Sequence, residues 1–242
     1  MKRRLVPALT AGLLALFVGH PITAQDFPNI GSQYIDYGAS MMAVGQMNNV
    51  LGSTVQRGGG APRGAAAVAG ATRYRASPEV SARVRQQFAD FVAKVSPADA
   101  DRLRQVIRQK DLLGAWEKHV AVDGLRRGDV ADAMTAYWVQ NWQIANNVPF
   151  TDRAQVQAVR GQVSQALSSN PAFARLDDAG KQEMAEVFML NFVAQGSAFS
   201  DATAKRDAGL TKRLSDAAVA RFRTAMNVDL RKLRLTQAGF AP

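Results

Sequence analysis

The sequence contains no cysteine and only two histidines in 242 residues. Without cysteine the chain cannot form a disulfide, a thiolate nucleophile, an iron–sulfur cluster or a cysteine-ligated zinc site. His20 lies in a segment that we expect to be removed, so His119 alone is left as a possible imidazole base. A single histidine cannot form a histidine pair around a metal. The composition therefore excludes cysteine chemistry and a histidine pair around a metal, and no motif in the sequence indicates a metal or a cofactor.

Glutamate is also scarce, because sixteen of the twenty acidic residues are aspartates. Several aspartates stand just before apolar helical patterns, where capping explains them without catalysis. Glu183 and Glu186 are three residues apart and share one helix face, where like charges can raise the pKa of one carboxyl group. A solvated pair in the first turn of a helix is the simpler interpretation. Hydrolysis of envelope polymers is thus the less favoured function.

The first 24 residues have the order of a secretory signal peptide. Three basic residues, 2–4, precede an apolar run from Leu5 to Val18, and Ala24 offers a small residue for cleavage. The run is shorter than the roughly 20 residues that cross a bilayer as a helix. We expect a periplasmic or secreted protein beginning at Gln25, with an uncleaved membrane anchor as the alternative. No later segment predicts a transmembrane helix.

Residues 25–76 differ in composition from the rest of the chain. Glycines at 31, 38, 45 and 52 recur every seven residues, each after an apolar residue. This pattern is typical of a helix that packs closely against another, although each interior glycine costs about 1 kcal/mol. Two interpretations stay open, a loosely ordered leader rich in Gly, Met and Asn, and a docked helix. Residues 57–70 read as a flexible linker.

Residues 77–242 predict a single helical domain. Ser77-Pro78 is a cap followed by proline, and Asp111, Asp129, Thr151 and Asp177 or Asp178 precede further apolar patterns of helical period. No alternation of useful length indicates a strand. The fold class is therefore all-α, with six to seven helices.

Four segments of this domain resemble a family of uncharacterised secreted bacterial proteins. They are GLRRGDVADAMTAYWVQNW (124–142), TDRAQVQAVRGQVSQAL (151–167), KQEMAE (181–186) and LRLTQAGF (233–240). The resemblance implies a signal peptide and an all-helical domain of unknown function. It implies no activity, so it assigns no functional residue.

Three amides lie where the helical pattern predicts the core. At about 100° per residue, Asn141 is central in its apolar arc, and Asn191 and Gln195 are central in theirs. A buried amide without a partner costs about 1–3 kcal/mol, so the two helices are expected to satisfy each other's amides. The alternative is a polar-bottomed pocket for a small ligand.

Basic charge gathers at the C-terminus. Residues 205–242 contain nine basic and three acidic residues. The pattern places five cations opposite the apolar face of a helix: Lys205, Arg206, Lys212, Arg213 and Arg223. Such a surface suits anionic lipid headgroups or polysaccharide, and a solvated face is the simpler alternative. No motif accompanies it that would indicate nucleic acid.

These features favour a non-enzymatic, exported interaction or binding module whose biochemical function is unknown. Its partner would be another protein or a component of the envelope. The alternatives are a peripheral protein held on anionic surfaces by its basic C-terminal helix and, less favoured, the hydrolase.

Overall fold

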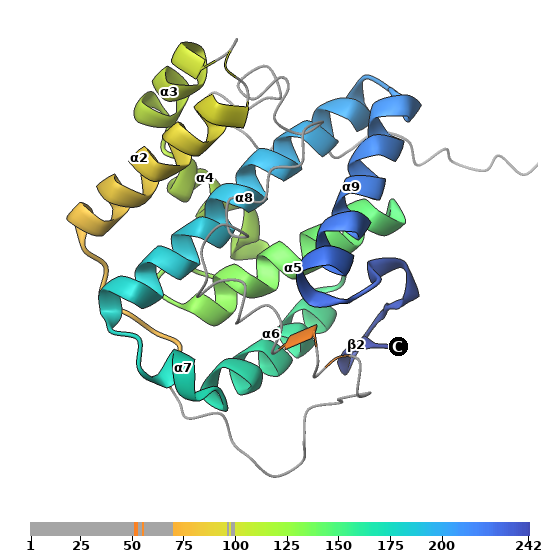
Figure 1. The fold of residues 1–242 in the computed structure, drawn as a ribbon. Helices are drawn as coiled ribbons and strands as arrows, with labels where there is room; N and C mark the ends of the chain where they lie inside the picture. Colours follow the sequence, from red (N-terminus) through yellow and green to blue (C-terminus); the bar gives the residue numbers. More distant parts are fainter. Residues whose placement is uncertain (1–50, 53–54, 56–69, 96, 98–99) are drawn as a thin grey trace, which may run out of the picture.

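The computed structural model describes residues 51–52, 55, 70–95, 97 and 100–242. The predicted signal peptide and most of the predicted leader and linker lie outside these residues. The described chain is a bundle of helices followed by a two-stranded sheet (Figure 1), which confirms the all-α prediction. Its elements are α2 (Pro78–Val95), α3 (Ala100–Gln109), α4 (Leu112–Val120), η3 (Ala121–Asp123), α5 (Val130–Asn146), α6 (Arg153–Ser168), α7 (Pro171–Ala174), α8 (Asp178–Ala204), α9 (Ala208–Met226), η4 (Leu230–Lys232), β1 (Arg234–Thr236) and β2 (Gly239–Ala241).

Helix α8 is the centre of the bundle (Figure 1). It packs against α2, α4, α5 and α9. Its buried residues occur on every side of the helix, including Met184, Val187 and Leu190. A helix that is apolar all round is stable only when other elements cover it. The length and composition of α8 thus decide how the other helices are arranged.

Aspartates begin most of the helices at the predicted places. The side chains of three of them accept hydrogen bonds from first-turn backbone N–H groups: Asp111, Asp129 and Asp177. The prediction that Thr151 begins the next helix is wrong by one residue. Asp152 is the cap there, because it forms a reciprocal capping box with Gln155.

The segment before α2 belongs to the packed unit. The backbone N–H of Tyr74 donates to the carbonyl of Gly128 over 3.1 Å, and that of Val130 donates to Thr72 over 2.9 Å. Thr72 is buried. These bonds tie residues 72–74 to the start of α5, so the packed chain begins before Ser77.

Three described positions of the predicted leader contact the core. Leu51 and Val55 are helical and fully buried. A Cβ on Gly52 would lie 3.1 Å from both the carbonyl oxygen of Met226 and a methyl of Val228, so glycine permits this close approach. At these positions the docked-helix interpretation describes the chain better than a loosely ordered leader does.

A short hairpin, which the sequence pattern did not predict, closes the C-terminus. Strand β1 pairs antiparallel with β2, with Leu235 opposite Phe240. The side chain of Gln162 on α6 forms two hydrogen bonds with the backbone of Phe240, as a neighbouring strand would. Its Nε2 donates to the carbonyl of Phe240 over 3.0 Å, and its Oε1 accepts from the N–H of Phe240 over 2.8 Å. Gly239 has φ +97°, and a Cβ there would collide with the Gln162 amide. The hairpin depends on α6, which explains why its three-residue strands gave no sequence signal.

Candidate functional site

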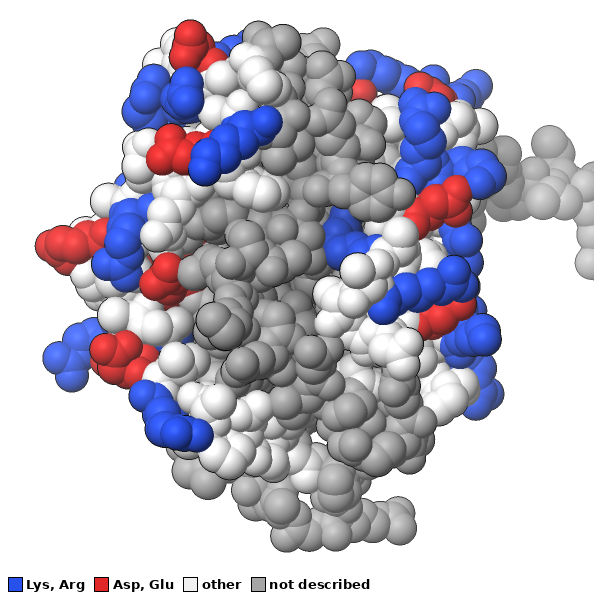
Figure 2. Space-filling model, in the orientation of Figure 1, with Lys and Arg blue, Asp and Glu red and all other residues white. Residues whose placement is uncertain are grey.

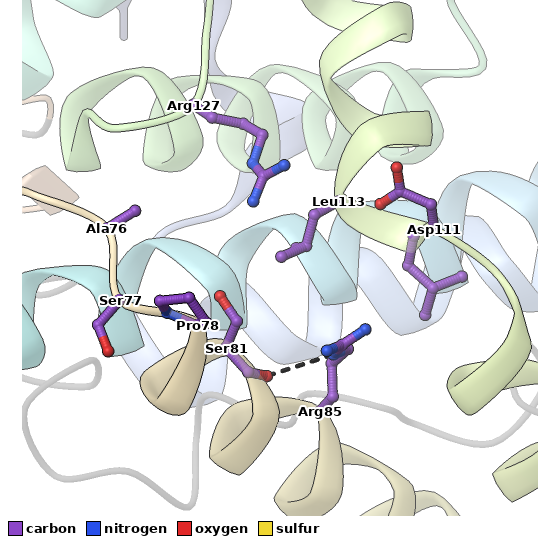
Figure 3. A pocket seen from close by; sticks show the side chains of 9 residues that line it. Ala76, Ser77, Pro78, Ser81, Arg85, Asp111, Leu113 and Arg127 are labelled. Carbon is purple, nitrogen blue, oxygen red and sulfur yellow. Dashed lines mark hydrogen bonds between the residues drawn. The ribbon is translucent and has the colours of Figure 1, made fainter.

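A pocket of about 320 Å³ opens between the N-terminal ends of α2 and α4. We call it the α2–α4 pocket (Figure 3). Three separate segments supply its lining: Ala76, Ser77, Pro78, Ser81 and Arg85; Asp111, Leu112 and Leu113; and Arg127. Its volume is at the lower end of the range for sites that bind small molecules.

Two arginines contribute the positive charge of the pocket. In Figure 3 the guanidinium of Arg127 points into the pocket, and that of Arg85 lies on the opposite side, beyond Leu113. The Nε of Arg85 donates to the backbone carbonyl of Ser81 over 3.4 Å. Neither guanidinium forms an ion pair with any described residue. Both charges are therefore available to a ligand.

Among the described residues of the lining, Asp111 is the only carboxylate. Its Oδ1 accepts a hydrogen bond from the backbone N–H of Gly114 over 2.9 Å, and its side chain turns toward the first turn of α4 (Figure 3). It caps that helix rather than pairing with Arg85 or Arg127. The pocket thus combines unpaired positive charge with an apolar wall that includes Leu113.

A buried polar cluster lies behind Ser81. The hydroxyl of Ser81 donates to Oε1 of Glu186 over 2.6 Å, and Nε2 of Gln182 donates to the same oxygen over 2.9 Å. The Oε1 of Gln182 also accepts from the backbone N–H of Ser77 over 2.7 Å. Burial raises the pKa of Tyr74 to about 12, and the charge of nearby Glu186 adds to this rise. The cluster holds the start of α2 against α8.

The predicted solvated pair of glutamates is wrong for Glu186. Glu186 is only 2% exposed. Glu183 lies closer to the surface and forms an ion pair with Arg83 over 3.3 Å. The two carboxylates have separate partners because α2 packs over the face of α8 that carries Glu186 and leaves Glu183 at its edge.

The predicted amides do connect two helices. Nδ2 of fully buried Asn141 donates to Oε1 of Gln195 over 3.1 Å and to the carbonyl of Tyr137 over 2.8 Å. The hydrogen bond between Asn141 and Gln195 joins α5 to α8, as the structural interpretation predicts. Asn191 is also buried, one turn earlier on α8. None of these amides lines the α2–α4 pocket.

The sequence interpretation missed the third member of this network, Arg221 on α9. Its Nη1 donates to Oδ1 of Asn141 over 2.5 Å. An arginine next to Phe222, on the edge of an apolar helix face, was the signal that could have indicated it. Arg221 completes the hydrogen bonding of Asn141 and joins α9 to α5.

A second buried charge cluster fixes the start of α5. Arg160 on α6 pairs with Asp132 through Nε and with Asp129 through Nη2, the latter over 2.9 Å. Both aspartates are buried. Burial and then the charge of Asp129 raise the pKa of Asp132, although its contacts with Arg160 lower it. Both carboxylates face Arg160, and neither lines the α2–α4 pocket.

The predicted basic surface is largely neutralised by neighbouring acids. Three of its five cations form ion pairs: Lys205 with Asp201, Lys212 with Asp216 and Arg223 with Asp229. Arg206 and Arg213 are exposed. The placement of Lys205 and Arg206 on the last long helix is wrong, because Lys205 is the C-cap of α8 and Arg206 lies in the turn before α9. Figure 2 shows acidic and basic side chains mixed on this face. Binding to an anionic surface stays a prediction.

Two other expectations concern metals and membranes. Among the described residues, no group of histidine and acidic side chains is placed to hold a metal ion. His119 lies against Phe192, with ring centroids 5.3 Å apart. None of the described helices has the length and apolar character needed to cross a bilayer.

The described residues form a helical domain, and the α2–α4 pocket combines charge with apolar surface. The model of a family of unknown function, DUF6683, matches residues 11–241, so the chain belongs to this family. No curated protein and no solved structure matches the chain.

Proposed function

We propose that this protein is an exported, non-enzymatic binding module that takes a small ligand in the α2–α4 pocket. The observation that carries the proposal is the pocket itself, where two guanidinium groups that have no carboxylate partner among the described residues lie beside apolar side chains. Elsewhere in the described chain, arginines such as Arg83, Arg160 and Arg231 pair with carboxylates. Solvent reaches Arg85 and Arg127, so a ligand in the pocket could bind either group without first breaking an ion pair between described residues.

The carboxylates support a binding role over hydrolysis. A glycosidase of the usual kind needs two carboxyl groups that flank one substrate bond in a shared cleft. Here Asp129 and Asp132 both face Arg160, and Glu186 accepts from Ser81 and Gln182. These contacts connect helices of the bundle, so the buried acids have a structural role. A binding module needs only the pocket.

Ligand binding is tested with four probes of similar size: hexanoate, glycerol 3-phosphate, hexanamide and hexylammonium. We expect at least one to show saturable NMR shifts of pocket residues in the purified full chain. Ala76→Trp should abolish this binding, because an indole at the rim would fill the pocket. Ala82→Trp is the matched control, since Ala82 is exposed on α2 and does not line the pocket. If none of the four probes binds, or if Ala76→Trp leaves binding unchanged, the pocket is not a ligand site.

Export rests on the positive, apolar and small residues at the start of the chain. We expect the intact mass of protein recovered from the periplasm or medium to begin at Gln25, within one or two residues. Lys2 and Arg3 changed to Glu together should leave the precursor in the cytoplasm, because signal recognition needs the positive start. Recovery of the uncleaved chain from the membrane fraction would instead support an anchor.

A further inference from the structure

We infer that the ligand of the α2–α4 pocket carries an anionic oxygen group, a carboxylate or a phosphate, bound between Arg85 and Arg127. The inference rests on the proposed function and adds the chemical class of the ligand. Guanidinium groups bind such oxygens through short, charge-assisted hydrogen bonds that a neutral group cannot match. Arg127 points into the cavity, and the terminal nitrogens of Arg85 form no hydrogen bond or ion pair with the described residues.

The helices add positive potential at the same place. The pocket is lined by the first residues of α2, an 18-residue helix, and of α4. The N-terminus of a helix carries roughly half a positive charge, which favours an anion next to it. Asp111 offsets part of this potential at α4 as its cap. At α2 the hydroxyl of Ser77 accepts from the N–H of Val80 over 3.4 Å and donates to the carboxylate of Glu79 in the first turn, so Glu79 offsets part of the potential there.

The carboxylate of Glu186 does not reach the space that a ligand would occupy. Glu186 is buried behind Ser81, and its Oε1 accepts from Ser81 and Gln182. It is not part of the lining. Among the described residues the charged side chains of the lining are Arg85, Arg127 and the capping Asp111, with the carboxylate of Glu79 bonded to Ser77 beside them. The two arginines are the groups that can bind an anion.

The apolar part of the lining suits a short hydrocarbon portion of the ligand. Ala76, Pro78, Leu112 and Leu113 supply carbon surface to the pocket. A volume of about 320 Å³ admits only a small molecule. The geometry thus favours a compact anion with a short hydrocarbon part over a large polymer.

The test compares hexanoate with hexanamide, which have the same length and differ in charge. We expect hexanoate to bind the full chain at least about tenfold more tightly than hexanamide does. Arg85→Gln and Arg127→Gln should each weaken hexanoate roughly tenfold and change hexanamide less than about twofold. Raising the salt concentration should weaken hexanoate selectively, because both arginines are at least partly exposed to solvent.

Two arginines near the pocket serve as controls for the loss of charge. Arg126 is the exposed neighbour of Arg127 in sequence, and Arg83 lies on α2 two residues before Arg85. Neither lines the pocket, so Arg126→Gln and Arg83→Gln should leave hexanoate affinity unchanged. Equal losses in all four variants would mean that general surface charge attracts the probe, and the inference would be wrong.

Glycerol 3-phosphate separates the two sources of anionic oxygen. Tighter binding of this probe than of hexanoate assigns a phosphate-bearing ligand, and the reverse assigns a carboxylate. Binding of hexanamide or hexylammonium as tight as that of both anions overturns the anionic class while leaving the binding module intact. If no probe binds, the proposed function is overturned as well. The experiment therefore distinguishes a wrong ligand class from a pocket that binds no ligand.

Discussion

Arg160→Gln is expected to lower the free energy of unfolding by about 3 kcal/mol, which should reduce the melting temperature by roughly 6–12 °C. The guanidinium of Arg160 pairs with both Asp129 and Asp132, whose side chains are only 3% and 2% exposed. Glutamine keeps some volume and loses the charge. Two buried carboxylates would then lack a cation. Thermal and urea denaturation of the full chain measure the loss.

The pH dependence of this variant identifies the cause. Burial already raises the pKa of Asp132 in the folded protein, and loss of Arg160 should raise it further. When the pKa of a carboxyl group is higher in the folded than in the unfolded state, the protein becomes less stable as pH rises from the unfolded-state pKa to the folded-state pKa. The deficit of Arg160→Gln should therefore be largest near neutral pH and shrink toward about pH 4.

Two further variants complete this experiment. Asp132→Asn in the Arg160→Gln background should recover part of the lost stability, because it removes one unpaired charge and keeps an acceptor for the backbone N–H of Arg126. Arg104→Gln is the control: it breaks an ion pair with a fully exposed carboxylate of Asp101 and should cost less than about 1 kcal/mol. A deficit that is equal at pH 4 and pH 7 would contradict the electrostatic explanation.

Asn141→Asp is expected to destabilise the protein by about 2 kcal/mol at neutral pH. In the native network the amide nitrogen of Asn141 donates to Gln195 and to the carbonyl of Tyr137. In Asn141→Asp a carboxylate oxygen replaces the amide nitrogen. It then faces two acceptors, Oε1 of Gln195 and the carbonyl of Tyr137, and can donate to neither. Arg221 reduces the cost, since it can form an ion pair with the new charge. Arg221→Gln should therefore make Asn141→Asp more costly than the two single changes predict together.

Asn170→Asp is the matched control for this substitution. Oδ1 of Asn170 only accepts, from the backbone N–H groups of Ala172 and Phe173. A carboxylate can accept both bonds, so the melting temperature should stay within about 2 °C of the wild type. If Asn141→Asp were as harmless as Asn170→Asp, the hydrogen bonds of Asn141 would contribute little to the packing of α5.

Helix positions were readable from the sequence because they depend on neighbours in the chain. Asp111, Asp129 and Asp177 cap their helices as predicted, since a cap involves only residues two or three positions away. The error at Thr151 has the same origin: two adjacent residues could both cap, and Gln155 decides for Asp152. The burial of Asn141, Asn191 and Gln195 followed from helical periodicity alone.

Only the tertiary structure decided which side chains meet. Glu186 looked solvated because its burial requires α2, about one hundred residues earlier, to cover that side of α8. Arg221 gained Asn141 as a partner only when α9 packed against α5. In both cases the side chain's surroundings come from another element, and periodicity within one helix does not contain that information.

The sequence by itself thus determined an all-helical chain, the starts of most helices and the amides that enter the core, because capping and periodicity are local. The hairpin at the C-terminus and the α2–α4 pocket are different in kind. The hairpin needs Gln162, which lies far earlier in the chain, and the pocket joins Arg85 to Arg127 across about forty residues. Such long-range contacts form when apolar faces pack together, so their partners are set by the folded bundle.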